Sequence, residues 1–405
     1  MYFLQTTLFS LEELQEMELK NRLTLLFSSL NLTPYANKLK STSPQGAPGH
    51  DREAILRALL ASPLEGIDKF TDLSTRLKED IRFRYCCGFG ISDNTPSVPT
   101  LSRVFAELTE KGLLEQLFYD LVDACYQEEI IDGTTIALDS TTIDAYEKKQ
   151  PKSKQSSTNA NWGAKFDSFK NKITWFGYKL HLAVDAESEL PTALKVTPAS
   201  VYDGDMGPEL VKNIAKQGHI DKVDYITADG GYDQYKNYEI ADHYNASAII
   251  PLNLRNEKQP PAGITSNGTP CCSMGYEMTY WGYEKNYLKF RCPHATGKVD
   301  CPHGTLWCSD KDYGMVVKVN IKDDLRRYCA PHRDSINWQK IYNKRTSVER
   351  CYSRLKENLT VNQLHVGGIE KVKTHIYLNV IVLLASALAA KRQQENQKNL
   401  EKVAA

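Results

Sequence analysis

Five short apolar segments between residues 134 and 252, each followed by turn-forming residues, constrain the fold more than any other feature of this sequence. Helical apolar spacing separates the later ones, at PELVKNIAKQ and YKNYEIADHY. Strands in succession, followed by strands that alternate with helices, predict an α/β core around a mixed sheet. The five segments are TTIALDS, YKLHLAVDA, TALKVTPASV, DYITADGG and NASAIIPL.

Residues 1–130 have helical apolar spacing instead, as in LEELQEMELKNRLTLLFSSL and DREAILRALLAS. Later in this part, the turn-rich segment GISDNTPSVP connects two further helical patterns. Two helices around such a turn can read DNA as a helix-turn-helix, with Arg103 near the exposed start of the second helix. A plain helical bundle fits the same pattern. We predict a helical N-terminal domain that binds DNA, with the plain bundle as the alternative.

A stretch rich in Pro, Gly, Asn and Cys follows Asn253 and has little periodicity, which is typical of an insertion. Helical patterns resume at Ser335, and the chain closes with a polar tail. The predicted organisation is a helical N-terminal domain at 1–130, the first part of the α/β core at 131–252, a Cys-rich insertion at 253–313, the rest of the core at 314–392 and the tail at 393–405.

Basic residues gather locally, although 50 basic and 50 acidic side chains cancel over the whole chain. The segment from Glu147 to Lys179 contains eight lysines, two acids and several aromatic residues. Lysines neutralise phosphates and exposed aromatic rings stack on bases, so this segment is a candidate DNA track, with an ordinary solvated face as the alternative. Trp175 and Phe176 are more typical of a strand core. The candidate contacts are Lys148, Lys149, Lys154, Trp162, Lys165 and Lys172.

Two aspartates close apolar strands in this pattern. Asp139 follows TTIAL, and Asp229 follows DYITA and precedes two glycines. Carboxylates at strand ends of an open α/β sheet lie where ligands bind, although each residue alone is also a common turn former. Asp233 is a rival ligand if the strand runs further, and the competing acids are Asp144, Glu147, Asp203, Asp205, Asp224 and Asp233.

A helix predicted over IYNKRTSVERCYSRLKENL carries four polar residues with spacings of three, four and seven. At about 100° per residue, Tyr342, Arg345, Glu349 and Lys356 fall within an arc of roughly 60°. Such a stripe is either a solvated ion-pair ladder or a metal-ligating carboxylate surrounded by groups that contact phosphate.

The spacing Y-x2-R-x3-E-x6-K of these four residues resembles the signature of a large group of insertion-sequence DDE transposases. ALDSTTI resembles the strand that carries their first Asp, GYKLHLAVDAESELPTALKVTPASVYDGD the hairpin that follows, and ADGGYD the end of the strand that carries the second Asp. RFRYCCGF and PSVPTLSRVF resemble the helical domain that precedes the catalytic core. The resemblance covers residues from about 50 to 390.

This resemblance implies an RNase H-like fold in which Asp139, Asp229 and Glu349 converge on two Mg²⁺ or Mn²⁺ ions. Two such ions about 3.5 to 4 Å apart activate a water or a 3′-hydroxyl for in-line displacement at phosphorus. Hard cations of this kind need only oxygen ligands. Arg345 and Lys356 would then bind phosphates, and Tyr342 would orient a phosphate or stack on a base.

We therefore expect a DNA transposase that cuts element ends and transfers strands. Its partners would be double-stranded terminal inverted repeats and target DNA, and it would act as a homodimer when bound to DNA. The alternatives are an RNase H-like nuclease or resolvase that only hydrolyses, and a domesticated DNA-binding protein. The N-terminus has no pattern of a secretory signal, and Asn379 interrupts the apolar run at Ile376–Ala390, so we expect no membrane span and a cytoplasmic, nucleoid-associated protein.

Five cysteines gather in the predicted insertion. RCPHATGKVDCPHGTLWCS places Cys292, Cys301 and Cys308 within seventeen residues, together with two histidines. Thiolates and imidazoles bind Zn²⁺ tetrahedrally and can hold a small lobe together. No C-x2-C pair is present, however, and free cysteines are often small buried apolar groups. Two hypotheses remain: packing residues, or a structural zinc on Cys292, Cys301 and Cys308 with Cys271 or Cys272 as the fourth ligand.

Overall fold

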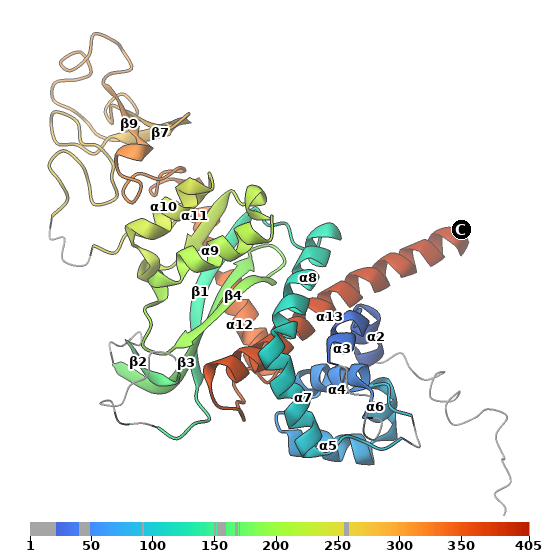
Figure 1. Cartoon of the computed structure of the whole chain (residues 1–405). Coiled ribbons are helices and arrows are strands. Elements are labelled where there is room, and N and C mark those ends of the chain that lie inside the picture. Colours follow the sequence, from blue (N-terminus) through green and yellow to red (C-terminus); the bar gives the residue numbers. More distant parts are fainter. Residues whose placement is uncertain are drawn as a thin grey trace, which may run out of the picture.

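A six-stranded mixed sheet lies at the centre of the chain (Figure 1). The computed structural model describes residues 22–39, 49–90, 93–149, 151, 159–166, 169, 171–254 and 259–404. The strands of the sheet are β1 (Thr135–Asp144), β2 (Asn161–Phe166), β3 (Lys172–Asp185), β4 (Pro191–Pro198), β5 (Tyr225–Ala228) and β6 (Ser247–Ile249).

The order of these strands defines the fold class. β3 pairs antiparallel with β1 on one edge and with β2 and β4 on the other, whereas β5 runs parallel to β1 and β6 parallel to β5. The path β4-β3-β1-β5-β6 is that of an RNase H-like sheet, so the predicted fold class is confirmed.

Both faces of the sheet are covered by helices, which explains why β4 and most of β3 are almost continuously buried. On one face lie α9 (Gly207–Lys216) and α10 (Tyr235–His243), which share a buried cluster with Ile136 and Leu138 of β1. The opposite face, which includes Ala137, Leu180 and Leu182, belongs to the largest buried cluster of the chain.

That largest cluster joins the sheet to the N-terminal helices through one long helix, α13 (Ile369–Ala404). α13 packs on β4 and on four helices of the N-terminal part, so these helices and the sheet share a core. It also continues through the polar tail that we predicted from residue 393.

By length and composition α13 is able to cross a membrane, but 72% of its apolar window is buried inside the protein, as in a core helix. The helices that precede β1 are α2 (Arg22–Ser28), α3 (Thr33–Lys38), α4 (Arg52–Leu64), α5 (Phe70–Glu79), α6 (Ile81–Cys86), α7 (Val98–Lys111) and α8 (Leu113–Gln127).

A small lobe follows β6 and lies away from the helical domain (Figure 1). It contains an antiparallel sheet of β7 (Thr279–Glu284), β8 (Tyr287–Arg291) and β9 (Val316–Asn320), with Met278, Leu288 and Phe290 as its buried residues. The third strand lies beyond residue 313, the predicted end of the insertion, because β9 pairs with β8 across a long irregular segment that gives no periodic signal.

The helix predicted over residues 341–359 is interrupted. α11 (Ile336–Asn343) and α12 (Thr346–Ser353) are separate, and a π-helical turn (Arg354–Asn358) follows. α11 packs Trp338 beside Ile249 of β6, whereas α12 joins the cluster on the β1 and β3 face. The chain bends between them because the two helices are buried against different parts of the sheet.

Candidate active site

Asp139 and Asp229 lie next to each other on adjacent parallel strands. Leu138 pairs with Ala228, and each aspartate is the next residue along the chain. β5 ends at Ala228, whereas β1 continues to Asp144 because residues 140–144 still pair with β3. Asp139 therefore lies inside a strand, not at its end as predicted. It lies, however, where the parallel pairing stops, so both carboxylates are at the same place on the sheet.

Burial dominates the electrostatics of this pair. Burial raises the pKa of Asp139 to about 7, and the charge of Asp229 also raises it. The backbone N–H of Ser140 donates to Oδ1 of Asp139 at 2.8 Å, and this hydrogen bond lowers the pKa in part. Burial also raises the pKa of Asp229, whereas the backbone N–H of Gly231, which donates to Oδ1 of Asp229 at 2.9 Å, lowers it in part. Two half-buried carboxylates that repel each other favour a bound cation.

Helix α12 is attached to this point of the sheet by Tyr352. The hydroxyl of this buried side chain lies 2.7 Å from the carbonyl oxygen of Asp139 and 3.1 Å from that of Leu180. Glu349 precedes Tyr352 by three residues, and residues three apart lie on the same side of a helix. Tyr352 thus fixes the helix that carries the third candidate carboxylate.

Arg345 links the three carboxylates electrostatically. Its guanidinium donates to Oε1 of Glu349 at 2.8 Å, and its charge lowers the pKa of both Asp139 and Asp229 against the effect of burial. Glu349 is itself about half exposed. The ion pair of the ladder hypothesis therefore exists, and it lies beside the two aspartates.

The candidate acids suit a hard divalent cation by donor type, because carboxylate oxygens are the ligands that Mg²⁺ and Mn²⁺ prefer. Asp139 and Asp229 also provide partly desolvated negative charge that such an ion would neutralise. Within the described ranges, no three His, Cys, Asp or Glu side chains are placed to hold one ion. Glu349 pairs with Arg345 through Oε1, and its side chain would have to move toward the aspartates to share an ion with them.

Tyr342 belongs to α11 and Lys356 to the π-helical turn, so the four residues do not lie on one continuous helix, although the guanidinium carbon of Arg345 lies 5.9 Å from the ring centre of Tyr342. Tyr342 stacks on Trp338 with ring centroids 4.9 Å apart. The Nζ of Lys356 donates to the hydroxyl of Thr141 at 2.6 Å, two residues beyond Asp139 on β1. Burial lowers the pKa of Lys356, and the neighbouring charge of Lys165 lowers it further. Two cations beside the acids provide a place for a phosphate.

The predicted DNA track is partly described. Lys148, Lys149, Lys165 and Lys172 are exposed, whereas Lys154 lies outside the described residues. Trp162 is half-buried against Phe176, and the Nζ of Lys149 lies 6.0 Å from the centre of its ring. Trp175 and Phe176 are buried, as expected of a strand core.

Arg103 is exposed near the start of α7, where its Nε donates to the carbonyl oxygen of Pro99 at 3.3 Å. This position agrees with the predicted exposed helix start. Which of the two hypotheses for the N-terminal helices is correct stays open, and DNA binding by Arg103 stays a prediction.

Asp233 and Asp203 are rival acids whose surroundings bear on the site. Asp233 is buried and pairs with Arg326 at 2.7 Å, so its charge is already matched inside the fold. Asp203 pairs with Lys179 at 2.8 Å and raises the pKa of both Asp139 and Asp229. Its turn lies directly on the turn after Asp229, because a Cβ on Gly204 would lie 2.7 Å from the carbonyl oxygen of Gly231. Asp203 is thus closer to the site than its place in a turn suggested.

Tyr352 is the site residue that the sequence interpretation missed. The signal was available, because a tyrosine three residues after a candidate helical ligand lies on the same side of the helix.

Four cysteines of the lobe, Cys272, Cys292, Cys301 and Cys308, line one cavity of about 10 Å³. His294 also lines it, and its Nδ1 accepts from the backbone N–H of Cys301 at 3.2 Å. These side chains are not placed to hold one metal ion, so the geometry does not support the predicted zinc.

Comparison with known families gave two matches. A model described as "Transposase DDE domain" matches residues 131–385, and one described as "Transposase domain (DUF772)" matches residues 10–107. Comparison with curated proteins gave no match.

Among solved structures, a piggyBac transposase synaptic complex with hairpin DNA is 12% identical, with a TM-score of 0.38 over 93% of this chain and 75% of that chain. A Drosophila P element transposase strand transfer complex is 11% identical, with a TM-score of 0.25 over 86% of this chain and 69% of that chain. Similarities this low carry no argument about function.

Proposed function

The chain belongs to the transposase DDE domain family, and from that premise we propose that Asp139, Asp229 and Glu349 are its three catalytic carboxylates. It is a DNA transposase, an enzyme of a family that cuts and joins DNA strands with divalent metal ions. The observation that carries the proposal is the pairing of Leu138 with Ala228, which brings two half-buried carboxylates together beneath the helix that holds the third.

The proposed ion is Mg²⁺ or Mn²⁺, held by Asp139, Asp229 and Glu349. When bound, such ions polarise the attacking oxygen and stabilise the leaving oxygen of an in-line displacement at phosphorus. The chain's own residues do the rest. Tyr352 holds α12 on β1, and Arg345, once Glu349 turns to the ion, is available to a phosphate of the DNA. Arginine suits this role because its planar fork can donate two hydrogen bonds to one phosphate.

The proposed DNA path continues from this site along β1. Lys356 lies over Thr141, and Lys165 is close enough to affect its pKa. Lys148, Lys149 and Lys172 extend the basic surface, and Trp162 offers the exposed part of its ring. A homodimer on paired DNA ends completes the proposal. Contacts of this kind bind the backbone and carry no sequence information, so recognition of the element ends belongs to other residues, for which Arg103 is our candidate.

Amide substitutions test the assignment of the carboxylates. Asp139→Asn, Asp229→Asn and Glu349→Gln nearly preserve shape and each remove one charge, so we expect cleavage of the element's own ends to fall by orders of magnitude while DNA binding persists. Glu239→Gln, an exposed acid on α10, is the matched control and should cleave normally. Near-normal cleavage by Glu349→Gln would show that the assignment is wrong.

The same assay separates a transposase from an enzyme that only hydrolyses. With target DNA present, we expect joined products in which an element end is linked to target. Cut ends without any joined product would favour a nuclease or resolvase that shares the fold.

A structural zinc in the lobe also stays a proposal. The support is that four cysteines line one small cavity in a lobe whose hydrophobic cluster has only three fully buried residues, with the remainder partly exposed. Metal binding would have to draw their sulfur atoms together.

A further inference from the structure

The lobe is unusually rich in exposed apolar side chains. Among the described residues, eight of the sixteen exposed large hydrophobic side chains lie between Met274 and Val316. Trp281 is 58% exposed, and Tyr287 and Tyr313 are each 44% exposed. Such a concentration on one small unit marks a binding surface more often than chance.

Three of these aromatic residues belong to one face of the β7-β8-β9 sheet. In β8, Leu288 and Phe290 are buried, so the residues between and beside them point to the opposite face. In the register of the sheet, Lys289 lies opposite Lys318. We call this surface the outer face; it consists of Trp281, Tyr287, Lys289, Arg291, Tyr313 and Lys318.

Arg291 is held between two aromatic rings on the outer face. Its guanidinium carbon lies 4.2 Å from the ring centre of Trp281 and 5.7 Å from that of Tyr313. Trp281 reaches this position because it is the extra residue of a bulge between Tyr280 and Gly282. Cation–π contacts restrain the side chain and leave the guanidinium edge as the donor surface, a geometry that suits a phosphate.

The lysines of the outer face repel each other. Like charges directly opposite on neighbouring strands destabilise a sheet, and Lys289 and Lys318 are such a pair. Glu284 forms an ion pair with Lys289 but leaves the excess charge of the face positive. Because successive outward residues of a strand are about 7 Å apart, the cations form rows along the sheet. A polyanion with regularly spaced charges would offset their repulsion.

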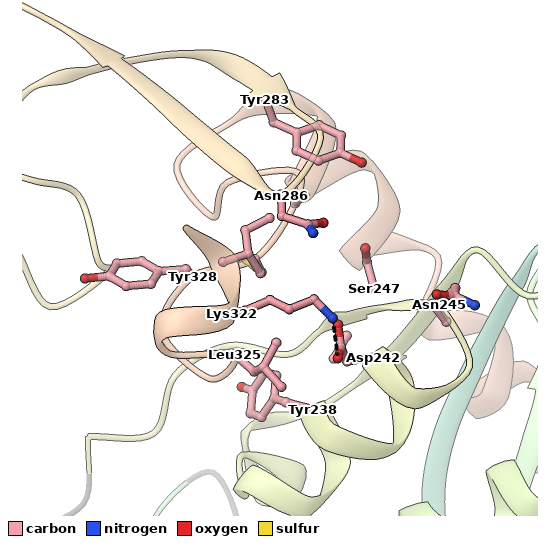
Figure 2. A pocket seen from close by; sticks show the side chains of 14 residues that line it. Tyr238, Asp242, Asn245, Ser247, Tyr283, Asn286, Lys322, Leu325 and Tyr328 are labelled. Atoms are coloured by element: carbon pink, nitrogen blue, oxygen red, sulfur yellow. Dashed lines mark hydrogen bonds and ion pairs between the residues drawn. The ribbon is translucent and has the colours of Figure 1, made fainter. Parts of the chain in front are cut away.

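The opposite side of the lobe is used to hold the lobe on the core. A cavity of about 240 Å³ at this joint is lined by residues of α10, β6 and the lobe, among them Tyr283, Asn286 and Lys322 (Figure 2). Lys322 pairs with Asp242 of α10 at 3.0 Å, and Arg326 pairs with Asp233 at 2.7 Å. The lobe is therefore anchored through one side, and the outer face is on another.

We propose that the outer face is a second DNA-binding surface, which contacts a DNA backbone outside the catalytic site. Lys289, Arg291 and Lys318 take the phosphates, and Trp281 packs on the sugar or an unpaired base. The combination of cations with exposed aromatic rings fits DNA, whereas a protein-binding patch is typically depleted of lysine. The proposal rests on the proposed function only in taking DNA as the partner.

The test measures binding of the full chain to duplex DNA of random sequence, in chelator so that no cleavage occurs, at a series of salt concentrations. For the triple variant Lys289→Ala, Arg291→Ala and Lys318→Ala we expect weaker binding and a salt slope reduced by about two to three, close to 0.9 per lost phosphate contact. Trp281→Ala should weaken binding with little change of slope. The control is Lys298→Ala, a lysine of the same lobe that pairs with Glu277 at 3.5 Å, and it should bind normally.

Acetylation of lysines in the wild-type chain provides a readout that needs no variant. DNA should protect Lys289 and Lys318 but not Lys298. Unchanged affinity and slope in the folded triple variant, or equal acetylation with and without DNA, would overturn the proposal. A loss of dimer mass in the triple variant with unchanged DNA affinity would also overturn it, because the outer face would then bind protein.

The two proposals fail in different ways. The triple variant should still cut element ends at saturating DNA, since its substitutions lie outside the catalytic site. Asp139→Asn should lose cleavage but keep the wild-type salt slope. If the assignment of the carboxylates is wrong, the expected effect of the triple variant on DNA binding is unchanged. If the proposal for the outer face is wrong, the expected effect of Asp139→Asn on cleavage is unchanged.

Discussion

The contact between Tyr352 and β1 gives the account a quantitative test. Tyr352→Phe removes one hydroxyl from a buried ring that lies 2.7 Å from the carbonyl oxygen of Asp139. A net hydrogen bond is worth about 0.5 to 1.5 kcal/mol, and a buried acceptor left without a partner costs about 1 to 3 kcal/mol. We therefore expect a loss of about 1 to 2 kcal/mol in the free energy of unfolding, measured by denaturant titration.

Catalysis should suffer beyond this loss of stability. The same contact fixes α12, so an added freedom of Glu349 worth about 1.4 kcal/mol slows cleavage about tenfold under conditions in which the variant is fully folded. Tyr377→Phe is the matched control: it removes a hydroxyl from an equally buried ring on α13, far along the chain from the acids. It should cut DNA at the wild-type rate. If Tyr352→Phe cuts as fast as Tyr377→Phe, the link from α12 to β1 does not position Glu349.

Two further predictions concern phosphate binding and zinc. Lys356→Gln should weaken binding of the element end and lower the salt slope by about one; a normal slope with a lowered melting temperature would mean that Lys356 only holds Thr141 in place. Zinc bound by the cysteines of the lobe would give about one equivalent per chain in protein purified without chelator, and earlier melting in a strong chelator. Less than about a tenth of an equivalent, with unchanged melting, would identify the cysteines of the lobe as packing residues.

The sequence was most informative where local pattern and tertiary pairing coincide. TTIALDS and DYITADGG each contain an apolar run followed at once by an acid, and the parallel register puts these acids side by side. The end of β1 was predicted too early, because Asp139 and Ser140 interrupt the apolar run, whereas the strand continues to Asp144 through pairing with β3. Thr141, Thr142 and Ile143 are residue types that favour strands, so part of this continuation could have been recognised from the sequence.

Helix breaks and distant pairings were the other limits. Nothing in the spacing of Tyr342, Arg345, Glu349 and Lys356 reveals a break, since the chain bends where α11 and α12 meet different parts of the sheet. The π-helical turn changes the position of Lys356 for the same reason, that tertiary packing overrides local preference. The third strand of the lobe, β9, forms only by pairing with β8, and a long irregular segment separates the two strands in the sequence. Its sequence pattern alone therefore did not predict it.

The central claim is that Asp139, Asp229 and Glu349 together hold the divalent ion used for strand cleavage. Anomalous diffraction from a crystal of the full chain grown with Mn²⁺ and a duplex that carries the element end tests this claim most directly. The account predicts manganese between the carboxylates of Asp139 and Asp229, with Glu349 turned from Arg345 toward the metal. Manganese bound elsewhere, with the pair of Arg345 and Glu349 intact beside DNA, would contradict it.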